Sequence, residues 1–281
     1  MKTKFLIALL CFPFFGNAQI SFNGSLFSHG IDFLEARIVF KDGHSETGFI
    51  KGFIDQPYIT FNYETGFESL EKQLNLTDKS FDFKNTDEGI SRKLTKDDVN
   101  QITVVHSKAK FSTYQLYSMK TANSKGKIVD SNRKIWLPLI KKGKVNILGF
   151  NIVNSNTGRY GETVVYLNKD GEDFVINPID RNRINLFNLG KIDDKFVATL
   201  NEIFKDCPEF LITINENPKA FTEQITKRVK ENRKEAEKEF KEGSKNLKGK
   251  DKKLLEIKIY EQFYISEYVR LIDDYLKFCP N

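Results

Sequence analysis

Two cysteines in the second half of the chain have the setting of a disulfide pair. Cys207 and Cys279 each end a segment with helical periodicity, and proline follows each of them directly. In an oxidising compartment the default state of such a pair is a disulfide, and this one would close a loop of 72 residues. We therefore expect a Cys207–Cys279 bridge. Two buried thiols, or one reactive cysteine, are the alternatives that the sequence leaves open.

Six lysines form a second group of residues that could bind a ligand. Acidic and basic side chains balance between residues 19 and 218, whereas residues 219–258 hold 14 basic and 8 acidic side chains. The cluster consists of Lys241, Lys245, Lys248, Lys250, Lys252 and Lys253. Such a cluster can contact anionic lipid head groups or acidic glycans. No aromatic residue lies among these lysines to stack on bases, so we predict no nucleic-acid partner. A solvated helix hairpin with internal Glu–Lys pairs is the alternative interpretation.

Catalytic patterns are absent from the sequence. The three histidines, His29, His44 and His106, lie far apart and do not form a zinc-protease motif, and there is no Gly-x-Ser-x-Gly elbow or phosphate-binding glycine loop. His44 lies beside Asp42 in an expected turn, where an exposed imidazole is ordinary. Four carboxylates cluster around another expected turn, which a solvated loop explains: Glu162, Asp170, Glu172 and Asp173. We assign no catalytic, cofactor-binding or metal-ligating residue.

The N-terminal 18 residues have the three parts of a secretory signal. Lys2 and Lys4 form a basic head, an apolar run covers residues 5–15, and Gly16-Asn17-Ala18 supplies small residues for cleavage. We expect the mature chain to begin at Gln19 and to be periplasmic or secreted. Lipid attachment at Cys11 is the alternative, which the large Leu10 before it disfavours. No later stretch approaches the roughly 18 apolar residues of a membrane helix, so we predict no transmembrane span.

Residues 19–190 alternate polar and apolar side chains in short runs, as strands do. The clearest hairpin pairs residues 36–41 with residues 46–53 across Asp42-Gly43, a dipeptide suited to a tight turn. Residues 135–140 form another expected strand, which Pro138 places at a sheet edge. At least seven such strands predict an antiparallel β-rich body, and the sequence does not choose between a barrel and a sandwich.

Residues 191–281 have helical periodicity instead. A first helix begins at Asp193 or Asp194 and is expected to end at Pro208, and a second begins at Asn217-Pro218. A third covers about residues 252–278, and the short basic loop before it predicts an antiparallel helix hairpin. The expected organisation is a signal peptide (1–18), a β-rich domain (19–190) and a helical region (191–281), in the α+β class.

Three short segments resemble uncharacterised exported proteins of Bacteroidota, of the flavobacterial type. They are Ile38-Val39-Phe40-Lys41-Asp42-Gly43, Thr47-Gly48-Phe49-Ile50-Lys51-Gly52 and the helix-ending Phe204-Lys205-Asp206-Cys207-Pro208-Glu209-Phe210. The resemblance implies a periplasmic or surface location in a Gram-negative cell and carries no activity. With scaffold and charge but no catalytic motif, the sequence favours a non-catalytic cell-envelope binding or structural module, whose partner is an unknown envelope protein or glycan. A secreted hydrolase of glycan or peptide, using carboxylates that spacing does not reveal, is the alternative.

Overall fold

The structure is a computed structural model that describes residues 19–21, 33–53, 58–66, 80–106, 110–123, 125–154, 156–179 and 192–280. The expected signal peptide lies outside these residues. The strands are β1 (Gln19–Ser21), β2 (Phe33–Phe40), β3 (Ser45–Lys51), β4 (Tyr58–Gly66), β5 (Phe81–Lys84), β6 (Arg92–Leu94), β7 (Val99–His106), β8 (Lys110–Ala122), β9 (Ile128–Lys141), β10 (Val145–Asn154), β11 (Tyr160–Lys169) and β12 (Phe174–Ile176). The helices are α3 (Ile192–Ile203), α4 (Pro208–Asn215), α5 (Pro218–Gly243) and α6 (Gly249–Phe278). The predicted α+β class is confirmed.

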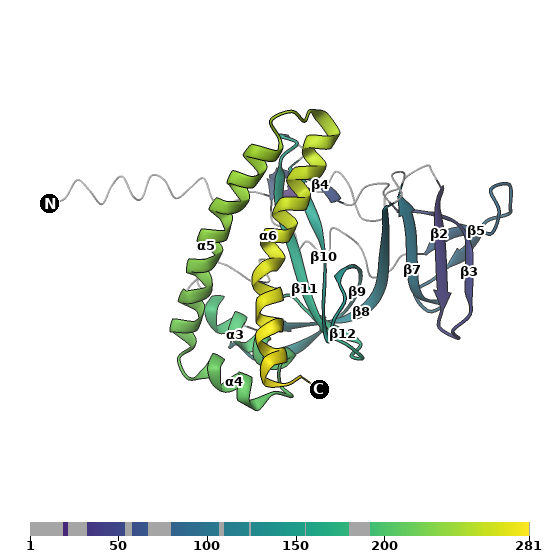
Figure 1. The fold of residues 1–281 in the computed structure, drawn as a ribbon. Coiled ribbons are helices and arrows are strands. Elements are labelled where there is room, and N and C mark those ends of the chain that lie inside the picture. The colour runs from purple at the N-terminus through teal and green to yellow at the C-terminus, as the bar shows by residue number, and fades with distance from the viewer. Residues whose placement is uncertain are drawn as a thin grey trace.

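Five strands close into a barrel. The ring runs β10–β11–β12–β8–β9 and returns to β10, because β9 pairs with both β8 and β10. Four of its contacts are antiparallel, and the β12–β8 contact is parallel. Between the barrel and the sandwich that the sequence left open, the structure therefore contains a barrel with additional strands outside it (Figure 1).

The additional strands extend the barrel wall on two sides. From β8 the sheet continues through β7, β2, β3, β5 and β6, and from β10 it continues through β4 to β1. The predicted hairpin is confirmed as β2 and β3, which pair from Phe33–Lys51 to Val39–Ser45. Gly43 lies in its turn with φ +91°, a left-handed conformation that glycine adopts without strain.

The alternating side chains of the barrel strands build two cores. Leu148 and Phe150 of β10 belong to the first core, which also contains the inward side chains of the outer sheet and the chain's single tryptophan, Trp136. Val145 and Ile147, on the opposite face of β10, pack with the helices in the second core. Both faces of β10 are buried as a result, and the buried Asn146 and Asn151 within it are hydrogen-bonded to Asn168 and Thr163.

Pro138 does not mark a sheet edge, so that expectation is wrong. It lies inside β9, opposite Tyr114 of β8, and β9 also borders β10. The β9–β10 ladder reaches only Leu139 and Lys141 on β9. Proline is tolerated here because Pro138 lies beyond the end of that ladder, where a missing N–H leaves no β10 partner unsatisfied.

The helices follow the predicted order with one addition. Pro208 ends the first helix region as expected, but it also occupies the first turn of α4, a separate helix that the periodicity did not reveal. Proline suits this position because the first amides of a helix have no intrahelical acceptor. The second predicted helix is confirmed as α5, which Asn217 caps by accepting a hydrogen bond from the amide of Ala220 at 3.1 Å.

Helices α5 and α6 form the predicted antiparallel hairpin, with α6 packed against the barrel strands β10 and β11 and α5 packed against α6 (Figure 1). Arg228 of α5 contacts Glu267 of α6, while Phe240, farther along α5, contacts Tyr260, which is earlier in α6. This reversed order defines the antiparallel arrangement. In the described part of the chain, no helix combines the length and apolar character needed to cross a bilayer.

Candidate binding surface at the end of the helix hairpin

The loop that joins α5 to α6 and the helix turns beside it carry all six lysines predicted from the sequence. We call residues 241–253 the basic tip; within it the six lysines outnumber two acidic residues, Glu242 and Asp251. Gly249 begins α6 with φ +53°. At the end of α5, the amide of Ser244 donates a hydrogen bond to the carbonyl of Phe240 at 2.9 Å. The backbone therefore reverses within a few residues and brings the lysines of both helices together.

The structure divides these lysines into two sets. Lys241, Lys245, Lys248 and Lys250 are exposed, and we call them the outer lysines. The other two lie near aromatic rings: Lys252, which is also exposed, has its Nζ 5.9 Å from the centre of the Phe240 ring, and the half-buried Lys253 has its Nζ 5.7 Å from that of Tyr58. The aromatic faces attract these ammonium groups and hold them against the body of the protein.

The tip brings together several lysines whose charge is not compensated by a carboxylate. Within the described ranges, none of the six ammonium groups takes part in an ion pair, whereas earlier in α5 the expected i,i+4 pairs occur between Lys219 and Glu223 and between Arg233 and Glu237. Lysines elsewhere do pair with carboxylates, among them Lys41, Lys84, Lys93, Lys120, Lys169, Lys205, Lys219 and Lys277. The tip thus presents uncompensated positive charge to solvent.

Contacts between α6 and the barrel position the tip. The buried carboxylate of Glu256 accepts a hydrogen bond from the amide of Tyr160 at 3.2 Å, and the Tyr160 ring stacks on Tyr260 with centroids 5.2 Å apart. Glu261 accepts a hydrogen bond from the side-chain amide of Asn151. Burial also raises the pKa of Tyr160, which keeps its phenol protonated. These contacts come from residues about a hundred positions apart, so sequence analysis had no local signal for them.

The hairpin itself contains a largely buried ion pair. Arg228 Nε donates to Glu267 Oε2 at 3.0 Å, and Asn232 donates to Glu267 Oε1 at 3.4 Å. The Glu267 side chain is only 9% exposed, so water contributes little to compensating its charge. This pair fixes the register of α5 along α6 and hence the place at which the two helices meet the tip.

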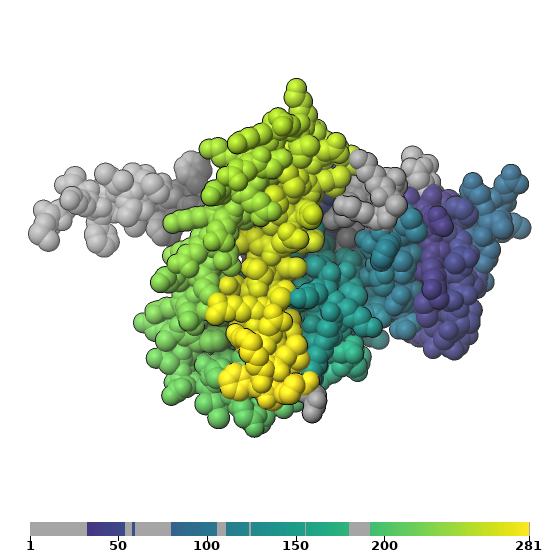
Figure 2. Space-filling model, viewed as in Figure 1, coloured from purple at the N-terminus to yellow at the C-terminus, as the bar shows by residue number. Residues whose placement is uncertain are grey.

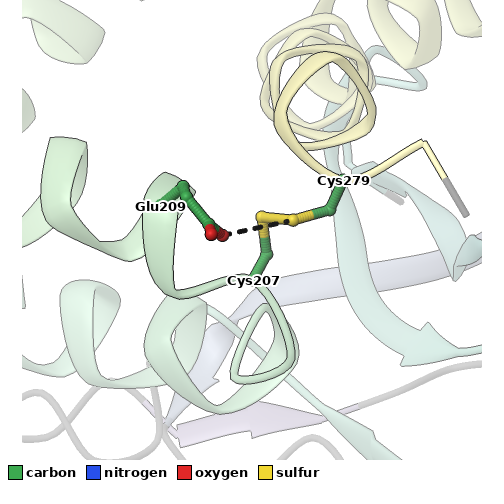
Figure 3. Close-up of side chains that lie close together, drawn as sticks. All are labelled: Cys207, Glu209 and Cys279. Atoms are coloured by element: carbon green, nitrogen blue, oxygen red, sulfur yellow. Dashed lines mark hydrogen bonds between the residues drawn. A yellow bond between two sulfur atoms is a disulfide. The ribbon is translucent and has the colours of Figure 1, made fainter.

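The opposite end of α6 is closed by the predicted disulfide. Cys207 and Cys279 are bonded, with their Cα atoms 6.0 Å apart, and the carboxylate of Glu209 lies 3.8 Å from Cys279 Sγ (Figure 3). The three side chains are grouped as metal ligands sometimes are. Two sulfurs bonded to each other have no thiolate to offer, so the arrangement serves as a covalent link between the start of α4 and the end of α6.

His44 and its neighbours form a second polar cluster. Its Nδ1 faces Asp42 Oδ1 at 2.5 Å and its Nε2 faces Glu46 Oε1 at 3.4 Å, while its ring stacks on Phe40. Two carboxylates facing both ring nitrogens favour the doubly protonated imidazolium, and the hydrogen bond to Asp42 raises the pKa of His44. An imidazolium is a poor general base, so this arrangement is structural.

A surface depression of about 470 Å³ adjoins this cluster, and its lining includes Asp42, His44, Glu46, Arg92 and Lys93. The charges that line it are largely satisfied by each other and by neighbours: Arg92 pairs with Glu46, and Lys93 with Asp82. The sequence pattern missed the role of Arg92, which lies 46 positions from Glu46. A depression whose charges are already compensated offers little to an ionic substrate.

Of the four carboxylates expected around one turn, Asp170, Glu172 and Asp173 lie between β11 and β12, but Glu162 lies near the opposite end of β11, so the four do not cluster. Glu172 lies 3.5 Å from Lys205, and Asp170 accepts a hydrogen bond from Asn146 at 3.5 Å. The barrel strands contribute buried side chains to the first core, including Trp136, Tyr166 and Phe150.

Searches against protein-family models, curated proteins and solved structures find no match for this chain. The exposed lysines and the other surface features of the chain itself are therefore the basis for inferring its function.

Proposed function

We propose that the protein is a non-catalytic module of the cell envelope that binds a polyanionic envelope component through the basic tip. The observation that carries the proposal is the group of four exposed outer lysines, which have no carboxylate partner among the described residues. Binding of anionic groups to such a cluster is favourable because it neutralises the repulsion between neighbouring ammonium groups. The filled barrel then acts as a scaffold for the hairpin.

The rigid mounting of the hairpin supports a binding role. A contact at one end of a helix binds a polyanion more tightly if the helix is already fixed to the rest of the molecule, because less conformational freedom is then lost on binding. Helix α6 is held at both ends, by Glu256 and Tyr160 near the tip and by the Cys207–Cys279 bridge at its C-terminus. The tip is therefore presented on a fixed support.

Export to an oxidising compartment is part of the proposal. The leader at residues 1–18 supports it, as does the disulfide, because such bonds persist mainly outside the reducing cytosol. Mass spectrometry of protein recovered from the periplasm or medium should find a chain that begins at Gln19 with no free thiol. A full-length chain with two free thiols in the cytosolic fraction would contradict export.

Cell fractionation tests the binding role. We expect the native protein to sediment with the envelope and to be released by salt, because screening weakens contacts between exposed charges. Replacing the outer lysines together (Lys241→Gln, Lys245→Gln, Lys248→Gln, Lys250→Gln) should move the protein to the soluble fraction.

A matched control loses the same charge elsewhere. Lys125, Lys127, Lys141 and Lys142 are exposed and lie at the turns that flank β9. Their replacement by glutamine should leave sedimentation with the envelope unchanged. If both quadruple variants still sediment like the native protein, or if the native protein never sediments, the proposed function is wrong.

A further inference from the structure

The shape of the basic tip indicates how large a polyanion it can bind. Figure 2 shows the end of the hairpin projecting beyond the rest of the molecule, so the surface that carries the outer lysines is convex. A small anion or a single sugar requires a concave site that surrounds it. A convex end with exposed charges instead fits a partner that is broad compared with the tip.

The chemistry of the cations points the same way. All six basic residues of the tip are lysines, and none is arginine. Arginine offers a planar fork that fits one phosphate or carboxylate in a defined geometry, whereas lysine is a flexible point charge. Four flexible point charges on a short turn suit anions that can rearrange to meet them, as lipid head groups do within the plane of a bilayer.

The hairpin also places the tip at a distance from the disulfide end. Helix α6 has 30 residues, which at about 1.5 Å per residue corresponds to a length of about 45 Å. The outer lysines lie on the last turn of α5, in the loop and on the first turn of α6. A flat partner can therefore meet the outer lysines end-on, without contacting the disulfide end of the molecule.

We infer that the polyanion is the head-group surface of an anionic lipid bilayer, which the basic tip contacts end-on and reversibly. This inference rests on the proposed function and names the class of partner. The contact is electrostatic, since within the tip the apolar side chain of Leu247 is already half-buried. Binding should consequently depend on the anionic lipid content and on salt.

Co-sedimentation of the purified full chain with vesicles tests the inference. One set of vesicles contains equal parts of phosphatidylcholine and phosphatidylglycerol, and the other contains phosphatidylcholine alone, which measures binding that does not depend on anionic lipid. We expect binding to the anionic vesicles only, and the outer-lysine variant should partition about 100-fold more weakly. The control variant at Lys125, Lys127, Lys141 and Lys142 should bind like the native protein.

A soluble anionic polysaccharide, such as heparin, separates the two proposals. Retention on the polysaccharide by the outer lysines, without binding to anionic vesicles, would overturn the bilayer inference and leave the polyanion function standing. Equal binding to both kinds of vesicle, or full binding by the outer-lysine variant, would also overturn the inference. If the native protein binds neither vesicles nor polysaccharide, both proposals fail. Circular dichroism of each variant verifies that it is folded.

Discussion

At the scale of single residues, local partners decide what each charged side chain does. The exposed His44 is an example, because its sequence neighbours Asp42 and Glu46 supply carboxylates to both ring nitrogens. The outer lysines form no ion pair among the described residues and keep their charge available for another molecule. Residue type alone does not distinguish a charge that stabilises a turn from one that binds a partner; the surrounding contacts do.

The His44 cluster predicts a pH dependence of the β2–β3 hairpin. The hydrogen bond from His44 to Asp42 raises the pKa of the histidine and lowers that of the aspartate. The histidine contribution to stability is therefore complete below its ordinary pKa of 6.5 and is lost as the pH rises through the raised value. The aspartate contribution is present above its ordinary pKa of 3.8 and is lost as the pH falls through the lowered value.

NMR titration of the His44 ring measures this effect. We expect a midpoint above 6.5, the ordinary value for histidine, and a lower midpoint in the Asp42→Asn variant, in which the carboxylate is gone. A His44 midpoint at or below the ordinary value in the native protein would show that the imidazolium is not the favoured form. The distant Asp130→Asn substitution, on β9, serves as a control that should not move the midpoint.

At the scale of elements, buried polar contacts fix how the helices are aligned. Helix α5 has only a narrow apolar stripe, so the Arg228–Glu267 pair contributes strongly to its register on α6. We expect Glu267→Gln to lower the free energy of unfolding by about 2 kcal/mol, because the mostly buried Arg228 loses its counter-charge. Urea denaturation measures the change.

The exposed pair of Arg233 and Glu237 on α5 provides the comparison. Its geometry is similar, at 3.1 Å, but both side chains are largely in water. Glu237→Gln should therefore cost less than about 0.5 kcal/mol. Equal effects of the two substitutions would mean that burial of the Arg228–Glu267 pair does not matter. The double replacement Arg228→Met with Glu267→Leu should recover much of the loss, since it leaves no unpaired charge.

The disulfide is the second device at this scale. It closes a loop of 72 residues that contains α4, α5 and α6. Replacing both cysteines (Cys207→Ala with Cys279→Ala) should lower the free energy of unfolding by about 4 kcal/mol, through the larger conformational freedom of the unfolded chain. The native protein in reductant should lose a similar amount, and an unchanged midpoint in urea would contradict this account.

At the scale of the whole molecule, barrel and helices share a core. Val145, Ile147 and Leu167 of the barrel pack in one cluster with Leu200 of α3 and Tyr275 of α6. Neither part can expose this surface without losing apolar burial. The division of the chain near residue 190 is visible as a change from strands to helices, but the shared core predicts that both sides unfold together.

Two spectroscopic signals follow the unfolding of the β-rich body and of the helices in one urea titration. Trp136 is the only tryptophan and is fully buried in the first core, so its fluorescence reports on the β-rich body. Far-ultraviolet circular dichroism reports mainly on the helices. We expect coincident urea transitions by the two signals, as for one cooperative unit. Two separated transitions would show that the helical region folds independently.

The sequence by itself determined the features that depend on near neighbours. A few adjacent residues are enough to specify each of them: the Asp42-Gly43 turn, the cap at Asn217 and the helical periodicity after residue 192. The disulfide was also predictable, because only two cysteines follow the leader. The strand that contains Pro138 was misplaced at an edge, because its setting depends on where the β9–β10 ladder ends. Helix α4 was missed because a proline that ends one helix also suits the first turn of the next.

Tertiary structure decided what depends on distant residues. Closure of the barrel requires β9 to pair with β8 and β10 together, and the mounting of the tip requires Glu256 to reach Tyr160, which is 96 positions away. The sequence located the six lysines, but only the folded chain separated the exposed outer lysines from Lys252 and Lys253, which lie near aromatic rings. The physical reason is that charge compensation and packing are set by distance in space, which a linear pattern does not contain.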